Sequence, residues 1–168
     1  FPKSASALRV LTPGVDLPND VGSELEAQIK CDQARRQLGV PLDAPCVLLV
    51  GNDFGKKGLP SLLKAFASLP VNTWLLAIGS AQRIPEYRKM ADDLGLGSRV
   101  VFHGALKDIT VAYSAADVLA HPTLEDTFAM VVLEAMVHKI PVVVSDETYC
   151  GIASMLMDGV NAVVLPYP

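Results

Sequence analysis

Two acidic residues eight positions apart, Asp126 and Glu134, lie where a ligand could be held. They follow the apolar run 117–120, which has the pattern of a buried strand, and Glu134 lies within the apolar segment 127–138, which has the pattern of a helix. In open α/β sheets, ligands bind outside the carboxyl ends of strands and next to helix N-termini. Eight helical residues separate two side chains by about 12 Å along the axis and about 80° around it. Carboxylates so spaced could accept hydrogen bonds from both ends of a nucleotide sugar.

Each carboxylate also has a simpler interpretation. Asp126 could be the N-cap of the following helix. Glu134 could be one polar position on the outer face of that helix, since burying an unpaired carboxylate is costly. Both interpretations remain open at this point.

The basic loop 51–58, Gly-Asn-Asp-Phe-Gly-Lys-Lys-Gly, is a second candidate site. Its three glycines allow a tight turn and a close approach of backbone to ligand. Lys56 and Lys57 precede a predicted helix, whose first amides and dipole favour an anion. The loop matches neither Gly-x-Gly-x-x-Gly nor Gly-x-x-x-x-Gly-Lys-Ser/Thr. Phosphate binding and a solvated basic turn are therefore alternatives.

Two histidines, His103 and His121, each end a predicted strand. A single histidine there is more often a packed or hydrogen-bonded residue than a catalyst, and we retain His103 as a candidate substrate-binding residue. Asp92 and Asp93 are expected to face solvent near the end of a helix. The three cysteines have no metal-binding spacing, so the sequence predicts no metal site.

The elements that would position these residues alternate between strand and helix. Short apolar runs, each followed by glycine or a polar turn, indicate strands that are buried on both faces. The predicted strands are 46–50, 73–78, 100–102, 117–120, 142–144 and 162–165, after an extended piece over 9–16. The predicted helices are 20–38, 59–69, 85–94, 107–115, 127–138 and a weak one over 151–157. This order predicts a Rossmann-like, doubly wound parallel sheet of about six strands with right-handed crossovers.

Composition limits the class of protein. The 168 residues suffice for one domain, and 51% of them are hydrophobic, with a mean hydropathy of +0.35. No apolar run approaches the roughly 18 residues of a membrane span. The net charge of −4 gives no indication of a nucleic-acid partner. An unpatterned, odd number of cysteines and the lack of a signal-peptide core lead us to expect a cytoplasmic protein. A start at Phe1 suggests a piece of a longer chain.

Three segments together, 51–58, 116–135 and 139–144, resemble the C-terminal, donor-binding domain of family 4 glycosyltransferases with the GT-B fold. Within that family they are most similar to the lipopolysaccharide core glucosyltransferase I type. The resemblance implies that residues 1–44 are the segment and linker helix that enter from an N-terminal domain. Residues 45–168 would be the nucleotide-sugar-binding domain, half of a GT-B fold, continuing beyond Pro168.

The family signature consists of two glutamates with seven residues between them. The second falls on Glu134, and the resemblance implies that it binds the donor ribose. The first falls on Asp126, which would contact the transferred sugar with a shorter side chain than the family's usual glutamate. The residues that follow it are implied to present backbone amides to the donor, with alanine where glycine is common: Thr127, Phe128, Ala129 and Met130.

The family's basic pair, usually arginine then lysine, falls on Lys56 and Lys57. The resemblance implies that they bind the diphosphate and stabilise the leaving group in a metal-independent site, so Lys56, Lys57 and Asp126 are the expected catalytic residues. Gly51 resembles the glycine that lets the backbone approach the donor.

The resemblance implies an enzyme that transfers a hexose, glucose in the most similar type, from a UDP-sugar to a lipopolysaccharide-type or lipid-linked acceptor with retention. It implies no cofactor beyond this donor. The missing domain would hold the acceptor and any peripheral membrane contact, so the isolated chain would bind donor without turnover. Two alternatives are a GT-B epimerase acting on UDP-N-acetylglucosamine, against which the acidic pair argues, and a non-catalytic nucleotide-binding module.

Overall fold

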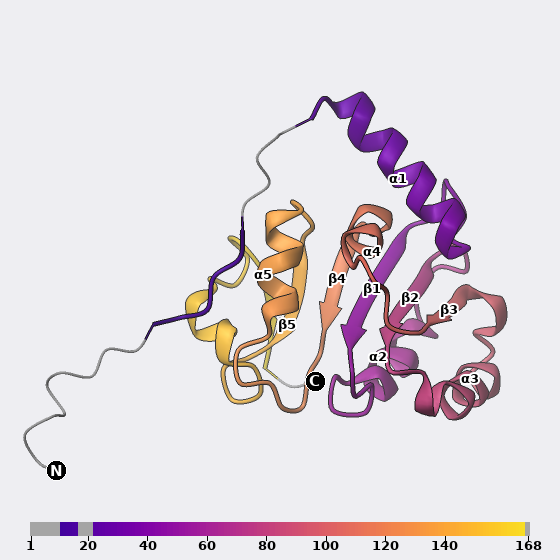
Figure 1. The fold of residues 1–168 in the computed structure, drawn as a ribbon. Coiled ribbons are helices and arrows are strands. Elements are labelled where there is room, and N and C mark those ends of the chain that lie inside the picture. Colours follow the sequence, from indigo (N-terminus) through magenta and orange to yellow (C-terminus); the bar gives the residue numbers. More distant parts are fainter. Residues whose placement is uncertain (1–10, 17–21, 167–168) are drawn as a thin grey trace, which may run out of the picture.

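Six parallel strands form one sheet in the order β3-β2-β1-β4-β5-β6 (Figure 1). The computed structural model describes residues 11–16 and 22–166. The strands are β1 (Cys46–Gly51), β2 (Trp74–Gly79), β3 (Val100–His103), β4 (Val118–His121), β5 (Val142–Ser145) and β6 (Val163–Leu165). The predicted Rossmann-like sheet is confirmed. The strand order reverses between β1 and β4, and in open α/β sheets ligands bind at such a point, outside the carboxyl ends of the strands.

Helices cover both faces of the sheet. One apolar cluster joins the sheet to α1 (Glu24–Leu38), α4 (Thr110–Ala115) and α5 (Met130–Val137), and a second joins it to α2 (Leu59–Phe66) and α3 (Ile84–Asp93). Neighbouring residues of β1 show the division, since Leu48 belongs to the first cluster and Leu49 to the second, and both are fully buried. Burial on both faces explains why the inner strands can be recognised in the sequence as short apolar runs. Within the described part of the chain, no helix combines the length and apolar character that crossing a bilayer requires.

Helix α1 begins later than predicted. Ser23 and Glu26 form a capping box, in which the Ser23 amide donates to Glu26 Oε2 at 2.7 Å, and this fixes the start at Glu24. The predicted helical residues 20 and 21 lie outside the described residues. The first half of α1 extends beyond the sheet (Figure 1), and Leu25 and Ile29 are therefore exposed. Gly39 ends the helix in the left-handed region, as expected.

Other helix ends also differ from prediction. Helix α2 stops at Phe66, three residues before the predicted end at Leu69, which is 41% exposed after the helix. Helix α4 starts at Thr110 because Asp108 Oδ1 accepts hydrogen bonds from both the amide and the hydroxyl of Thr110. The weak helix predicted over 151–157 is a 3-10 helix over Gly151–Met155.

Candidate functional site

Two loops, 52–58 after β1 and 122–129 after β4, are bound to each other at the carboxyl edge of the sheet (lower end of the strands in Figure 1). The Lys56 carbonyl accepts hydrogen bonds from the Leu124 amide at 2.8 Å and the Thr123 hydroxyl at 3.0 Å. Gly58, with φ +75°, lies directly against the Pro122 carbonyl, where a Cβ atom would overlap it. The basic loop and the acidic turn are therefore held side by side.

Two ion pairs join these loops, one inner and one outer. Lys57 Nζ lies 2.7 Å from Asp126 Oδ2, with side chains 20% and 17% exposed. Lys56 Nζ lies 2.8 Å from Glu125 Oε2, with side chains 56% and 73% exposed. Water screens the outer pair, so the inner pair contributes more to local electrostatics. The hydrogen bond from Lys56 lowers the pKa of Glu125 below its usual value.

The Asp126 carboxylate accepts four hydrogen bonds. Its Oδ1 accepts from the amides of Phe128 at 3.2 Å and Ala129 at 2.7 Å. Its Oδ2 accepts from Lys57 Nζ at 2.7 Å and lies 3.1 Å from His121 Nε2. An ionised carboxylate has about four acceptor positions, so this one is saturated. A sugar hydroxyl would have to displace one of these four donors.

His121 anchors Asp126 from inside the protein. Its side chain is fully buried, and the buried Nδ1 has no hydrogen-bond partner among the residues described. A neutral ring with its proton on Nε2 donates to Asp126 and leaves Nδ1 as an acceptor. Burial alone would raise the pKa of Asp126, but the hydrogen bonds from His121 and Lys57 outweigh it and hold that pKa far below its usual value.

Helix α5 begins at Met130, three residues later than predicted. The Oδ1 of Asp126 holds two amides in a turn before the helix, and Ala129 takes the left-handed conformation there, with φ +66° and ψ +68°. Asp126 therefore caps this turn and is not the helix N-cap. The amides of Phe128 and Ala129, which the resemblance assigns to donor binding, donate to Asp126 in this structure. Thr127 is exposed.

Glu134 differs from Asp126 because its carboxylate still has free positions to accept hydrogen bonds. It lies half-buried in the second turn of α5, and its Oε2 accepts a hydrogen bond from the Tyr113 hydroxyl of α4 at 2.6 Å. Within residues 22–166, this is the single hydrogen bond that its carboxylate makes. Glu134 therefore keeps acceptor positions for a ligand.

Gly51 and His103 are also placed by the structure. Gly51 ends β1, and a Cβ atom there would collide with the Lys57 side chain, so the glycine makes room for that lysine. His103 ends β3, two strands away from β1. The described contacts do not connect His103 to Lys57 or Asp126.

Sequence reasoning missed the roles of three residues, Tyr113, His121 and Thr123. The position of His121 at a strand end was a usable signal, because its ring meets the acidic turn that follows. Tyr113 gave no such signal, since its contact with Glu134 depends on how two helices pack. Thr123 is fully buried and bridges the Lys56 and Glu125 carbonyls.

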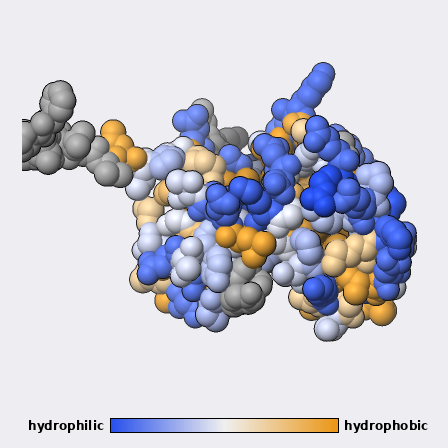
Figure 2. All heavy atoms as spheres, turned by 90° about the horizontal axis from the view of Figure 1, so that it is seen from below, coloured by the Kyte–Doolittle hydropathy of each residue, from blue (hydrophilic) through white to orange (hydrophobic). Residues whose placement is uncertain are grey.

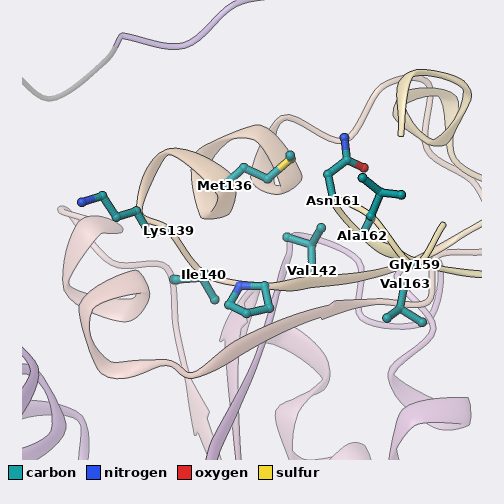
Figure 3. Close-up of a pocket in the computed structure, with 10 residues that line it drawn as sticks. Met136, Lys139, Ile140, Val142, Gly159, Asn161, Ala162 and Val163 are labelled. Carbon is teal, nitrogen blue, oxygen red and sulfur yellow. The ribbon is translucent and has the colours of Figure 1, made fainter. Parts of the chain in front are cut away.

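The cavity of greatest interest by volume does not coincide with this site. A cavity of about 470 Å³ lies at the opposite end of β5 and β6, where these strands begin (Figure 3). Most of its lining is apolar and includes Met136, Ile140 and Val142. Figure 2 shows the face at the carboxyl edge from below: hydrophilic residues lie across its middle, beside a small hydrophobic patch, and a larger hydrophobic area lies at the lower right. A polar surface suits a ligand that carries phosphates and hydroxyl groups.

Residues 31–168 match the sequence model of the family described as glycosyl transferases group 1. The chain belongs to this family. Two relatives among known proteins are a lipopolysaccharide glucosyltransferase, WaaG, of Escherichia coli K12 and a D-inositol 3-phosphate glycosyltransferase of Xylanimonas cellulosilytica. Both are 32% identical, over 80% and 94% of this chain. The chain spans 36% and 39% of their lengths.

Solved structures with the GT-B fold are similar to this chain. The crystal structure of WaaG superposes with a TM-score of 0.74 and 30% identity, covering 83% of this chain and 38% of WaaG. HepE of Anabaena, in complex with UDP and glucose, also gives 0.74, with 25% identity over 87% of this chain and 42% of HepE. The resemblance to a GT-B glycosyltransferase domain is thereby confirmed.

Proposed function

We propose that this chain is the donor-binding part of a retaining, metal-independent glycosyltransferase that transfers a hexose from a UDP-sugar. The observation that carries the proposal is the contact between the basic loop and the acidic turn at the reversal of strand order. Lys56 and Lys57 bring two positive charges to this edge, where ligands bind in sheets of this type. The family membership of the chain supports the same assignment.

Different residues would bind different parts of the donor. Lys56 and Lys57 would bind the diphosphate and stabilise the negative charge that grows as it departs, which is worth roughly 2–4 kcal/mol of barrier per donor. Glu134 would accept hydrogen bonds from the ribose. Asp126 would act on the transferred sugar only after one of its present donors, such as Lys57, turns to the diphosphate. Thr127 and Met130 would lie along the same side of the donor, with Gly51 beneath it and His103 at its far end.

Relatives suggest the sugar and the acceptor. WaaG is described as a lipopolysaccharide glucosyltransferase, and LpsE of Rhizobium meliloti, 33% identical over 132 residues, as a lipopolysaccharide core biosynthesis glycosyltransferase. HepE was solved with UDP-glucose. We therefore propose glucose as the hexose and a lipopolysaccharide-type saccharide as the acceptor. An inositol phosphate is a second candidate acceptor, because the relative that matches 94% of this chain is described as a D-inositol 3-phosphate glycosyltransferase.

The rest of the assignment follows from this donor. We propose that the reaction takes place in the cytoplasm and needs no cofactor beyond the nucleotide sugar. Acceptor binding, and any peripheral contact with a membrane, would belong to parts of a longer protein. The chain by itself would bind donor without turning it over.

A thermal-shift screen against UDP-, GDP- and ADP-sugars tests the proposal. A ligand that binds only the folded state stabilises it by RT ln(1 + [L]/Kd), or about 2.7 kcal/mol at one hundred times Kd. We expect UDP-glucose to raise the melting temperature most. No shift with any nucleotide sugar would favour a non-catalytic module with another ligand.

Lys57→Ala tests the diphosphate role. It should weaken UDP binding at least tenfold and leave uridine binding nearly unchanged, as measured by calorimetry, because only UDP presents phosphates to the lysine. Lys64→Ala, which removes an exposed lysine from α2, is the matched control and should alter neither affinity. Equal losses for UDP and uridine would contradict the phosphate role.

A further inference from the structure

The Glu134 carboxylate is held by a neighbouring helix. Tyr113 of α4 donates its hydroxyl hydrogen to Glu134 Oε2 across 2.6 Å. A distance this short is typical of a hydroxyl donating to an ionised oxygen, and such bonds are about twice as strong as neutral ones. The Tyr113 oxygen also lies 3.5 Å from the Val131 carbonyl, near the limit of hydrogen bonding. One oxygen of Glu134 is thus fixed from inside the protein.

Tyr113 is itself fixed. It is 2% exposed, and its ring stacks on that of His138, with centroids 5.1 Å apart and planes inclined by 18°. His138 follows Glu134 by one helical turn, and its amide donates to the Glu134 carbonyl at 3.1 Å. The Tyr113 ring therefore stacks on the residue that ends α5, His138, while its hydroxyl donates to Glu134 within that helix. Burial and the nearby Glu134 carboxylate raise the pKa of Tyr113 far above its usual value, so the hydroxyl remains a donor.

We propose that Tyr113 is a positioning residue for donor binding: by occupying Oε2 of Glu134, it leaves Oε1 in a fixed place to accept the ribose hydroxyls. The proposal rests on the proposed function, in which Glu134 binds the ribose. It adds a residue that touches no part of the donor. Without the hydroxyl, the half-buried Glu134 side chain could rotate. Binding of the ribose would then have to fix that side chain, and this loss of entropy would weaken the binding.

The test compares UDP with 2′,3′-dideoxy-UDP, which lacks both ribose hydroxyls. Calorimetry gives a discrimination ratio, the Kd for the dideoxy nucleotide divided by the Kd for UDP. In the unaltered protein we expect a ratio of about ten or more, since hydrogen bonds to a charged group are worth that factor. Glu134→Ala should reduce the ratio to about one. Tyr113→Phe keeps the ring on His138 and should reduce the ratio several-fold, with little change in the Kd for the dideoxy nucleotide.

The outcomes separate this inference from the proposed function. A reduced ratio in Glu134→Ala but an unchanged ratio in Tyr113→Phe overturns the positioning role alone. A ratio unaffected by Glu134→Ala, or no UDP binding by the unaltered protein, overturns the ribose assignment and the positioning role with it. A merely structural role for Tyr113 would weaken binding of both nucleotides equally.

Tyr87→Phe is the matched control. Tyr87 is also buried, at 6% exposure, but its ring lies on α3 against Phe54 of the basic loop, and its described contacts include neither Glu134 nor Tyr113. Removing its hydroxyl should leave the discrimination ratio unchanged. Thermal melts of all three variants establish that each is folded at the temperature of the binding measurement.

Discussion

Asp126 and Glu134 illustrate how two carboxylates of one motif come to differ. Asp126 gives all of its acceptor positions to donors within the protein, whereas Glu134 gives one to Tyr113. Aspartate is one methylene shorter than glutamate, so its carboxylate stays close to the backbone and reaches the amides of its own turn. Side-chain length thus decides whether the first carboxylate organises the loop or reaches outward.

Asp126→Asn should lower the free energy of unfolding at pH 7 by about 1–3 kcal/mol. The amide group would present hydrogens to Lys57 or His121, which are donors themselves. Because the folded-state pKa of Asp126 is depressed, its contribution is present above the unfolded value of about 3.9 and is lost as the pH falls below it. Urea unfolding at pH 7 and near pH 3 should therefore show the difference between the two proteins shrinking in acid.

Glu125→Gln is the control for this pH dependence. It removes the charge of the outer, exposed pair and should leave stability nearly unchanged at both pH values. A loss as large as that of Asp126→Asn would contradict the distinction between an inner and an outer pair.

Ala129→Gly should stabilise the protein. Alanine at φ +66° is strained by its Cβ atom, at a cost of about 1–2 kcal/mol, and glycine removes this strain at a smaller cost in unfolded-state entropy. We expect a net gain of about 0.5–1 kcal/mol by chemical denaturation. Ala91→Gly, within α3, should instead destabilise by about 1 kcal/mol. A loss of stability in Ala129→Gly would show that the methyl group, which is buried, matters more than the strain.

At the level of elements, the two loops of the site act as one unit. The turn at Asp126 is also fixed from its other side, where its amide donates to the Tyr149 carbonyl and its carbonyl accepts from the Gly151 amide. The basic loop, the acidic turn and the segment after β5 therefore share backbone hydrogen bonds. The lysines keep their positions because the backbones beneath them are joined.

Gly58→Ala tests this joint. Alanine there incurs the strain of a positive φ and also a collision with the Pro122 carbonyl, which is backbone and cannot rotate away. Gly95→Ala, at φ +70° with open space around it, incurs the strain alone. By urea denaturation, Gly58→Ala should lose clearly more stability than the roughly 1–2 kcal/mol of Gly95→Ala. Only Gly58→Ala should weaken UDP binding, because it separates the loops.

The elements also show what sequence could predict. All six strands were predictable because each is a short, uninterrupted apolar run. The inner strands are buried on both faces, and even the edge strand β6, where Val163 is 48% exposed, keeps this pattern. Several helix starts were not predictable, because side-chain hydrogen bonds decide them: Asp108 accepts from Thr110 at the start of α4, and Asp126 accepts from Ala129 in the turn before α5. Family spacing predicts Lys57 and Asp126 as site residues, and the structure brings these two side chains together. Its supporting contacts, from Tyr113 and His121, depend on packing between elements and leave no local pattern.

At the level of the whole molecule, the site lies at the carboxyl ends of the strands and α1 is attached at their amino ends. Arg35 of α1 is 5% exposed and donates to the carbonyls of Ala115, Leu42 and Ala44 at 2.7–3.0 Å. It also meets Asp117 Oδ2 at 2.8 Å. These contacts bind α1 to the amino ends of the strands, where β1 and β4 begin. Figure 1 shows α1 at this end and the two loops of the site at the other.

Arg35→Met should therefore cost stability without altering the site. It leaves buried carbonyls without a donor, and we expect a loss of about 2–3 kcal/mol by urea denaturation. The half-exposed Asp117 adds little to this, since water can replace its partner. Arg36→Met is the matched control, because Arg36 is 64% exposed and meets Asp32 only at 4.0 Å, so its loss should be under about 0.5 kcal/mol. At a temperature where both variants are folded, each should bind UDP with the Kd of the unaltered protein. Weaker UDP binding by folded Arg35→Met would mean that the position of α1 is coupled, through β1 and β4, to the loops that hold Lys57 and Asp126.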